Sequence, residues 1–180
     1  MNEELAAELA RMAADDQRAR DKASGGSHRP GPAVSQEGVA EMRRVDARNT
    51  RRLREILDEH GWPGRSLVGD EGVQHAWLIA QHADDDVEFQ RRALALLTEA
   101  VAADDAPASL VAYLTDRVRM HEGQGQLYGT QIMDLREDEV VPFAIDDPAG
   151  LDHRRAQVGL PPFACYAERV KKLLASERDR

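Results

Sequence analysis

The sequence predicts a mainly α-helical protein: a bundle of about five helices followed by a β-hairpin and two C-terminal helices. Apolar residues recur at helical spacing over most of the chain up to His121. Residues that favour strands are concentrated between 126 and 145, and Gly and Pro separate the helical segments. A chain of 180 residues can bury a real core, so we expect residues 1–180 to form a single domain.

The first two helices are predicted over residues 3–22 and 36–60. Between them, residues 23–34 are rich in Gly, Pro and Ser and predict a flexible connector. Ser35 is the expected N-cap of the second helix, because its hydroxyl can accept a hydrogen bond from the first turn. The sequence Gly61-Trp62-Pro63-Gly64 then ends this helix.

The third helix is expected to open at residues 70–71 and to end in the aspartate run 84–86. Apolar residues lie on more than one side of this helix, which predicts that it is buried. The fourth helix is expected over 86–103, where Asp85 and Glu88 resemble a capping box.

The remaining elements are expected in this order: a helix over 108–122, a strand over 126–133, a turn at 135–139, a strand over 140–145, a short helix over 146–159 and a last helix over 162–177. Pro142 is expected on an edge strand, because proline cannot donate to a sheet. Cys165 is the only cysteine, and the apolar stretch around it predicts a buried, unreactive thiol.

Charge and hydropathy exclude several classes of partner. The net charge is −9, which opposes binding to nucleic acid or to anionic lipid. No apolar run approaches the ~20 residues that a membrane-spanning helix needs. The acidic N-terminus differs from a secretory signal, so we expect a cytoplasmic protein without a membrane partner. The oligomeric state is left open.

Polar residues interrupt the apolar faces of several predicted helices. A buried polar group without a partner costs about 1–3 kcal/mol, so several of them in one core indicate a use. We expect those on four further helical faces to meet His82 in one polar cavity, namely Asp16, Asp46, Asn49, Gln90 and Arg117. The alternative is a hydrogen-bond network that only rigidifies the bundle.

A series of short motifs runs along the chain: Asp16-Gln17-x-x-Arg20, Asp46 with Asn49, Gly61-Trp62-Pro63, Gln81-His82-Ala83-Asp84 with Phe89-Gln90, Thr115-Asp116-Arg117, Gln126-x-Tyr128-Gly129-Thr130-Gln131, and Arg154-Arg155 before Gly159-Leu160. This series resembles an uncharacterised family of bacterial proteins that is frequent in actinobacteria. The resemblance extends over nearly the whole chain. It implies no activity, but it emphasises His82 over His75 and His121.

We expect a small enzyme of transferase, lyase or hydrolase type that uses acid–base chemistry. His82 is the predicted proton-transfer group, since imidazole titrates near neutrality. Asp84 is the second catalytic candidate. It can orient the imidazole if the helix breaks at Ala83, and its alternative role is helix capping. The substrate-binding candidates are Asp16, Arg20, Asp46, Asn49, Trp62, Gln81, Gln90, Asp116, Arg117, Gln126, Tyr128, Gln131 and Arg154.

The expected substrate is small and polar, either amino-acid-like or carboxylate-bearing. Arg117, with Arg154, is the predicted holder of its anionic group, and Asp16 or Asp46 is expected to pair with Arg117. At least one of Arg154 and Arg155 is expected to be a solvated surface residue. A non-catalytic module that binds a small ligand or a peptide is the alternative from another class.

No cofactor and no metal are expected. The sequence contains no phosphate-binding loop and no dinucleotide fingerprint. His75 and His82 lie two helical turns apart, about 10.5 Å, which is too far for one ion. A mixed metal site of Asp16, Asp46 and His82 is the alternative.

Overall fold

The computed structural model describes residues 1–24, 35–136 and 139–176. The larger part of the predicted connector, 25–34, lies outside the described residues. The chain divides into two compact units, Met1–Ala106 and Pro107–Arg180, and each is described by itself. The single domain expected from the sequence stays a prediction.

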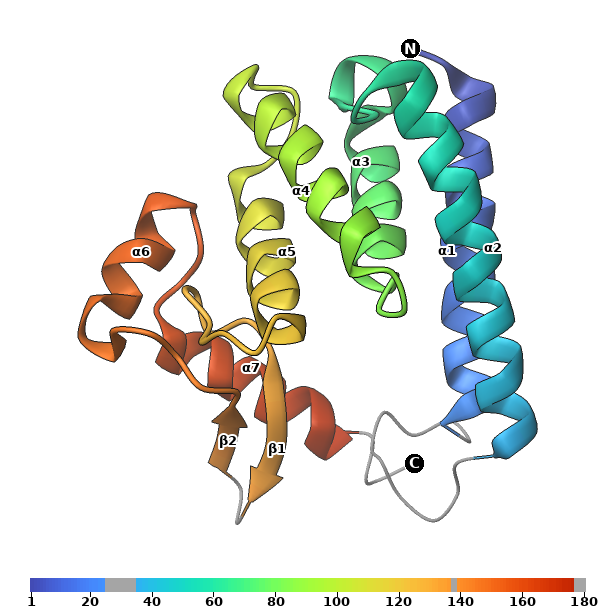
Figure 1. Cartoon of the computed structure of the whole chain (residues 1–180). Coiled ribbons are helices and arrows are strands. Elements are labelled where there is room, and N and C mark those ends of the chain that lie inside the picture. Colours follow the sequence, from blue (N-terminus) through green and yellow to red (C-terminus); the bar gives the residue numbers. More distant parts are fainter. Residues whose placement is uncertain (25–34, 137–138, 177–180) are drawn as a thin grey trace. The chain divides into compact units, whose positions relative to one another are not determined.

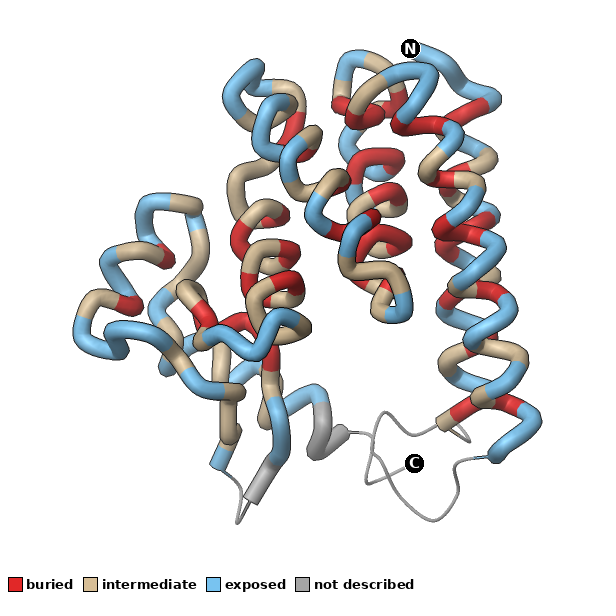
Figure 2. The backbone as a smooth tube through the Cα atoms, viewed as in Figure 1, coloured by how far each residue is buried: buried red, intermediate tan, exposed pale blue. Residues whose placement is uncertain are grey.

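The first unit contains four helices: α1 (Glu3–Ala23), α2 (Gln36–His60), α3 (Arg65–Gln81) and α4 (Val87–Ala102). α1 and α2 run antiparallel beside each other, and α3 packs against α1 (Figure 1). Buried positions recur along all four helices (Figure 2), and most of the residues there are apolar and form the core. Six of the most deeply buried side chains are Leu9, Leu53, Ile56, Val73, Phe89 and Leu97. Each contributes about 1.5–3 kcal/mol by leaving water.

The boundaries of α2 follow local signals and match the predicted ones. The Ser35 hydroxyl accepts a hydrogen bond from the Gly38 amide at 2.9 Å, as an N-cap does. Gly61 takes a positive φ of 69° at the other end. A Cβ at Gly38 would lie 2.7 Å from the Cα of Ala23, so glycine permits the close approach of α1 and α2 here.

α3 differs from its prediction at the N-terminal end. It begins at Arg65, earlier than the expected 70–71, and Gly69 interrupts it with a φ of 73°. The second segment therefore starts where the sequence predicts, and the turn before it is an additional short helix. α3 ends at Gln81, and His82 is its C-cap.

The N-cap of α4 is Asp86, not the predicted Asp85. The Asp86 carboxylate accepts a hydrogen bond from the Phe89 amide at 3.0 Å. The predicted capping box with Glu88 is therefore wrong by one residue. Asp85 is exposed instead.

The second unit contains α5 (Ala108–His121), β1 (Ile132–Arg136), β2 (Glu139–Pro142), the 3-10 helix η1 (Pro148–Gly150), α6 (Leu151–Gln157) and α7 (Phe163–Ser176). β1 and β2 pair antiparallel. The predicted order of five helices, a hairpin and two C-terminal helices is confirmed. Within the described ranges no helix is both long and apolar enough to cross a bilayer.

The hairpin begins later than predicted, because side chains bind the backbone of the preceding segment. Residues 126–131 were expected to form most of the first strand. Three of their amides, at 127, 128 and 130, donate instead to the carboxylate of Asp116, and the amide of 131 donates to the side-chain oxygen of Gln126. The predicted turn at 135–139 overlaps the ends of both strands, and 137–138 lie outside the described residues.

The expectation for Cys165 is wrong. Its side chain is exposed on α7, although apolar neighbours surround it in the sequence. The apolar positions of this helix that turn inward are the neighbouring Phe163 and Tyr166, which contact each other.

Candidate functional site

A cleft of about 530 Å³ lies in the first unit. α2 forms one part of its lining and the turn 82–86, between α3 and α4, forms another. Its charged lining consists of four arginines and four aspartates around His82: Arg20, Arg43, Arg51, Arg54, Asp46, Asp84, Asp85 and Asp86. The volume lies within the range of small-molecule sites.

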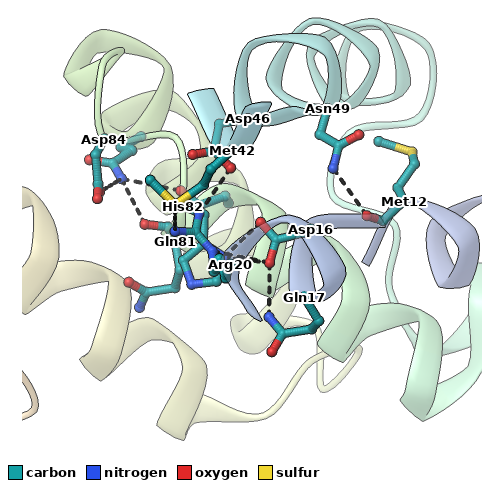
Figure 3. A network of polar contacts seen from close by, with 12 residues as sticks. Met12, Asp16, Gln17, Arg20, Met42, Asp46, Asn49, Gln81, His82 and Asp84 are labelled. Carbon is teal, nitrogen blue, oxygen red and sulfur yellow. Dashed lines mark hydrogen bonds and ion pairs between the residues drawn. The ribbon is translucent and has the colours of Figure 1, made fainter. Parts of the chain in front are cut away.

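His82 is held by a carboxylate from another helix. Asp16 continues the apolar face of α1, as predicted, and only 2% of its side chain is exposed. Its two oxygens lie 2.9 Å from Nδ1 of His82 (Figure 3). Because His82 ends α3, the imidazole is carried by the turn rather than by a continuous helix.

Arg20 approaches the same imidazole nitrogen. Its Nε lies 2.9 Å from Nδ1 of His82 and 3.3 Å from Oδ2 of Asp16. If Nδ1 accepted from Arg20, both Asp16 oxygens would lie 2.9 Å from an unprotonated nitrogen, with no proton between them. We therefore assign the proton to Nδ1, which donates to Asp16, while Arg20 donates to Oδ2. The lone pair of neutral His82 is then on Nε2, the arrangement that a general base requires.

The same guanidinium joins Asp16 to Asp46 of α2. Nη2 of Arg20 donates to Oδ1 of Asp46 at 2.9 Å, and Nη1 lies 3.3 Å from the Met42 sulfur. Figure 3 shows Arg20 between the residues of α1, α2 and the turn. Three separate segments of the chain thus contribute to one connected group, which we call the His82 network: Asp16, Arg20, Asp46 and His82.

The two carboxyl groups of the network have pKa values that are shifted in opposite directions. Burial alone would raise the pKa of Asp16, but the hydrogen bond and charge of His82, together with Arg20, lower it. For Asp46, burial dominates. Arg20 opposes it, the neighbouring Asp16 and Asp84 carboxylates reinforce it, and the pKa rises to about 6. Opposite shifts in adjacent carboxyl groups are the pattern of an acid–base pair.

Stability should depend on pH through Asp46. Its folded pKa of about 6 lies above its ordinary 3.8, so the folded protein retains a proton that the unfolded chain loses. The free energy of unfolding should therefore fall between pH 4 and pH 6, by up to about 3 kcal/mol, and this loss should be absent in Asp46→Asn. Urea unfolding across this range measures the effect, with exposed Asp21→Asn as the control. Parallel pH curves for wild type and Asp46→Asn would contradict it.

The two remaining candidates near the turn have different surroundings. Asp84 lines the cleft and accepts a hydrogen bond from Nε2 of Gln90 at 3.4 Å. The helix does end before Asp84, as its predicted orienting role required, but the carboxylate on Nδ1 of His82 is Asp16. Gln90 is fully buried and also donates to the carbonyls of Ala80 and Gln81 at 3.2 Å. It thus satisfies last-turn carbonyls of α3, which accounts for its burial.

Three other predicted substrate-binding residues of this unit are buried outside the cleft lining. Asn49 donates to the Met12 carbonyl at 3.0 Å and thereby joins α2 to α1. Trp62 and Gln81 are buried, and among the described residues nothing accepts from Nε1 of Trp62 or Nε2 of Gln81. None of the three lines the cleft.

The candidates after residue 107 belong to the second unit. Asp116 is fully buried and accepts from the amides of Leu127, Tyr128 and Thr130. Gln126 is also fully buried; it donates to the carbonyls of Gln131 and Phe143. Both side chains therefore hold the backbone of the loop before β1.

Groups of the second unit bind the side chains of Arg117, Arg154 and Arg155. Nη1 of Arg117 donates to Oε1 of Gln131 at 2.9 Å, whereas Asp16 and Asp46 have Arg20 as their partner. Arg154 donates to the Leu127 carbonyl and to oxygens of residues 146–147. Arg155 is fully buried against two aromatic rings, and its guanidinium donates to the carbonyls of residues 128 and 161. Of the two arginines, Arg154 is the one at the surface, with 21% of its side chain exposed, and it is bound there to neighbouring groups.

Sequence reasoning missed three arginines of the cleft: Arg43, Arg51 and Arg54. They lie on the polar side of α2, where solvated charges are the rule. The available signal was spacing, because Arg43, Ala47 and Arg51 are four residues apart and share one side of the helix.

No three His, Cys, Asp or Glu side chains surround a point suited to a metal ion within the described residues. In the alternative metal site of Asp16, Asp46 and His82, the guanidinium group of Arg20 lies between the two carboxylates and binds both of them.

The fold and site define a helical protein whose N-terminal unit carries a charged cleft above a His–Asp–Arg network. The chain belongs to the family of unknown function DUF6624, whose model matches residues 3–175. This confirms the resemblance to an uncharacterised family over nearly the whole chain. No curated protein and no solved structure matched the chain.

Proposed function

We propose that this protein is a small enzyme that performs acid–base chemistry on a small polar substrate in the cleft of its first unit. The observation that carries the proposal is the His82 network. The buried Asp16 carboxylate lies 2.9 Å from the imidazole and orients it. The Asp46 carboxyl group has a raised pKa, binds the same arginine, Arg20, and lines the same cleft as His82. Perturbed titratable groups in a cleft are typical of catalytic sites.

In this proposal His82 accepts a proton from the substrate through Nε2. The buried Asp16 keeps the other nitrogen protonated and stabilises the imidazolium that forms. Asp46 is the complementary acid, because a carboxyl group with a pKa of about 6 is partly protonated near neutrality and can return a proton. Arg20 fixes the distance between the two groups and is a positioning residue.

The test begins with a binding screen and ends with turnover. Amino acids, short peptides, sugars and organic phosphates are screened by thermal shift, and each stabilising compound is incubated with the protein and followed by proton NMR. We expect wild type to convert at least one of them. His82→Asn should reduce the rate at least about 100-fold, the usual contribution of a general base. Exposed His153→Asn is the matched control and should leave the rate unchanged.

Two outcomes contradict this function. A compound that binds the cleft but is returned unchanged by wild type would identify a non-catalytic binding module. Conversion that His82→Asn retains in full would show that the chemistry occurs elsewhere. One equivalent of metal, lost on His82→Ala, would instead favour the mixed metal site.

A further inference from the structure

The charges of the cleft are unevenly distributed between its elements. α2 contributes three arginines, Arg43, Arg51 and Arg54, and one aspartate, Asp46, whereas the turn contributes Asp84, Asp85 and Asp86. The formal charges of the lining balance, with four arginines against four aspartates, although the whole chain carries −9. The cleft is therefore neutral as a whole, but its α2 side is mainly positive and its turn side is negative.

Half of these eight charges are neutralised by ion pairs within the cleft. Arg54 pairs with Asp86 at 2.5 Å, which ties the turn to α2. Arg20 pairs with Asp46 at 2.9 Å. Within residues 1–24, 35–136 and 139–176, no ion pair or hydrogen bond engages the side chain of Arg43, Arg51 or Asp85. Asp84 accepts a hydrogen bond from the neutral amide of Gln90. Besides Asp84, the cleft therefore retains two cationic groups on α2 and one anionic group on the turn.

The spacing of the two arginines suits a shared anion. Arg43 and Arg51 are eight residues apart, about 12 Å along the helix axis, and Ala47 lies midway on the same side. Ala47 has no atoms beyond Cβ, so it does not obstruct the space between the two longer side chains, and all three residues are exposed. Guanidinium groups bind carboxylate or phosphate through paired N–H donors.

We propose that the substrate of this cleft is bipolar: it carries an anionic group, bound by Arg43 and Arg51, and a cationic group, bound by Asp85. This inference rests on the proposed function in that it concerns the same cleft. A ligand with only one charge would displace water from the charged groups of both α2 and the turn, but it would supply a counter-charge to only one of them, which is unfavourable. A ligand with both charges satisfies α2 and the turn together, and its middle lies near His82 and Asp46.

Matched series of simple probes test the proposal. The ω-amino carboxylates with one to five methylene groups carry both charges at increasing separation. Alkanoates and alkylamines of the same lengths carry one charge each. Binding to the wild-type protein is measured by calorimetry at low salt. We expect at least one ω-amino carboxylate to bind about tenfold or more tightly than the alkanoate and the amine of its length.

The variants assign the two ends of the ligand. Arg51→Gln should weaken the best ω-amino carboxylate about tenfold without affecting the alkylamine of that length. Asp85→Asn should weaken it similarly without affecting the alkanoate. Arg44→Gln is the matched control, because Arg44 lies on the same helix, pairs with Glu41 at 3.0 Å and does not line the cleft. It should bind as wild type does.

Several results would overturn the proposal: an alkanoate or amine that binds as tightly as the ω-amino carboxylate, an equal loss in Arg44→Gln, or no binding by any member at about 10 mM. These results are distinct from failure of the proposed function. If an ω-amino carboxylate binds as expected but wild type converts no bipolar compound, the function fails and the ligand class stands. If wild type converts only singly charged compounds, and this conversion requires His82, the proposed function stands and the proposed bipolar ligand class fails.

Discussion

Replacing Arg20 by methionine should destabilise the protein by about 3 kcal/mol at neutral pH, the low end of the cost of breaking a buried ion pair. Arg20 is the cation shared by Asp16 and Asp46, and 23% of its side chain is exposed. Methionine preserves much of the apolar stem but removes the charge. Two neighbouring carboxyl groups would then share the site with His82 alone, so at least one must take up a proton or move toward water.

Chemical denaturation of wild type and Arg20→Met measures this loss. Arg18→Met is the control, because Arg18 is on the same helix and is paired with Asp15 at the surface, where ion pairs contribute under about 1 kcal/mol. Adding Asp16→Asn to Arg20→Met should restore part of the stability, since it removes the uncompensated charge. If Arg20→Met costs no more than Arg18→Met, the His82 network does not form as described.

Replacing Asp116 by alanine should cost about 3–5 kcal/mol in the second unit, among the largest effects of any single substitution. The carboxylate is fully buried and accepts from the amides of Leu127 at 2.7 Å, Tyr128 at 3.1 Å and Thr130 at 2.9 Å. The Thr130 hydroxyl also donates to it at 2.9 Å. Alanine leaves all of these donors without their acceptor, and each buried unpaired donor is costly.

Hydrogen exchange gives a local readout of this prediction. The amides of 127, 128 and 130 should exchange faster in Asp116→Ala, together with a lower thermal midpoint. Asp116→Asn keeps the shape but replaces one acceptor oxygen by a donor group, so it should give an intermediate loss. Glu168→Ala, at an exposed position of the same unit, is the control. Unchanged protection of the three amides in Asp116→Ala would contradict this role.

The sequence by itself determined the elements whose signals are local. The bounds of α2 follow from the Ser35 cap and Gly61, and the face of α1 that carries Leu5, Leu9 and Met12 also placed Asp16 in the core. Caps and periodicity act within a few residues of the chain, so they can be read without knowing the fold. The resemblance selected His82 from three candidate histidines, and His82 lines the cleft.

Only the tertiary structure decided which polar residues meet. Sequence patterns predicted that Asp16 and Asp46 are buried, but the cation that binds both of them is Arg20 rather than the predicted Arg117. Arg20 lies 62 residues from the histidine beside it. Such a contact depends on how α1, α2 and the end of α3 pack. Periodicity indicates which side of a helix is buried, not what lies against it.

Tertiary structure also decided what the other buried polar side chains bind. Gln90, Asp116 and Gln126 interrupt apolar surroundings just as ligand-binding residues would. Each instead satisfies backbone groups of a neighbouring segment, at the end of α3 or in the loop before β1. A buried amide or carboxylate needs a partner, and the chemistry of a backbone N–H or C=O is the same as that of many ligands. The residue type therefore predicts that a partner exists, while the packing of the chain decides whether that partner is a substrate or the protein itself.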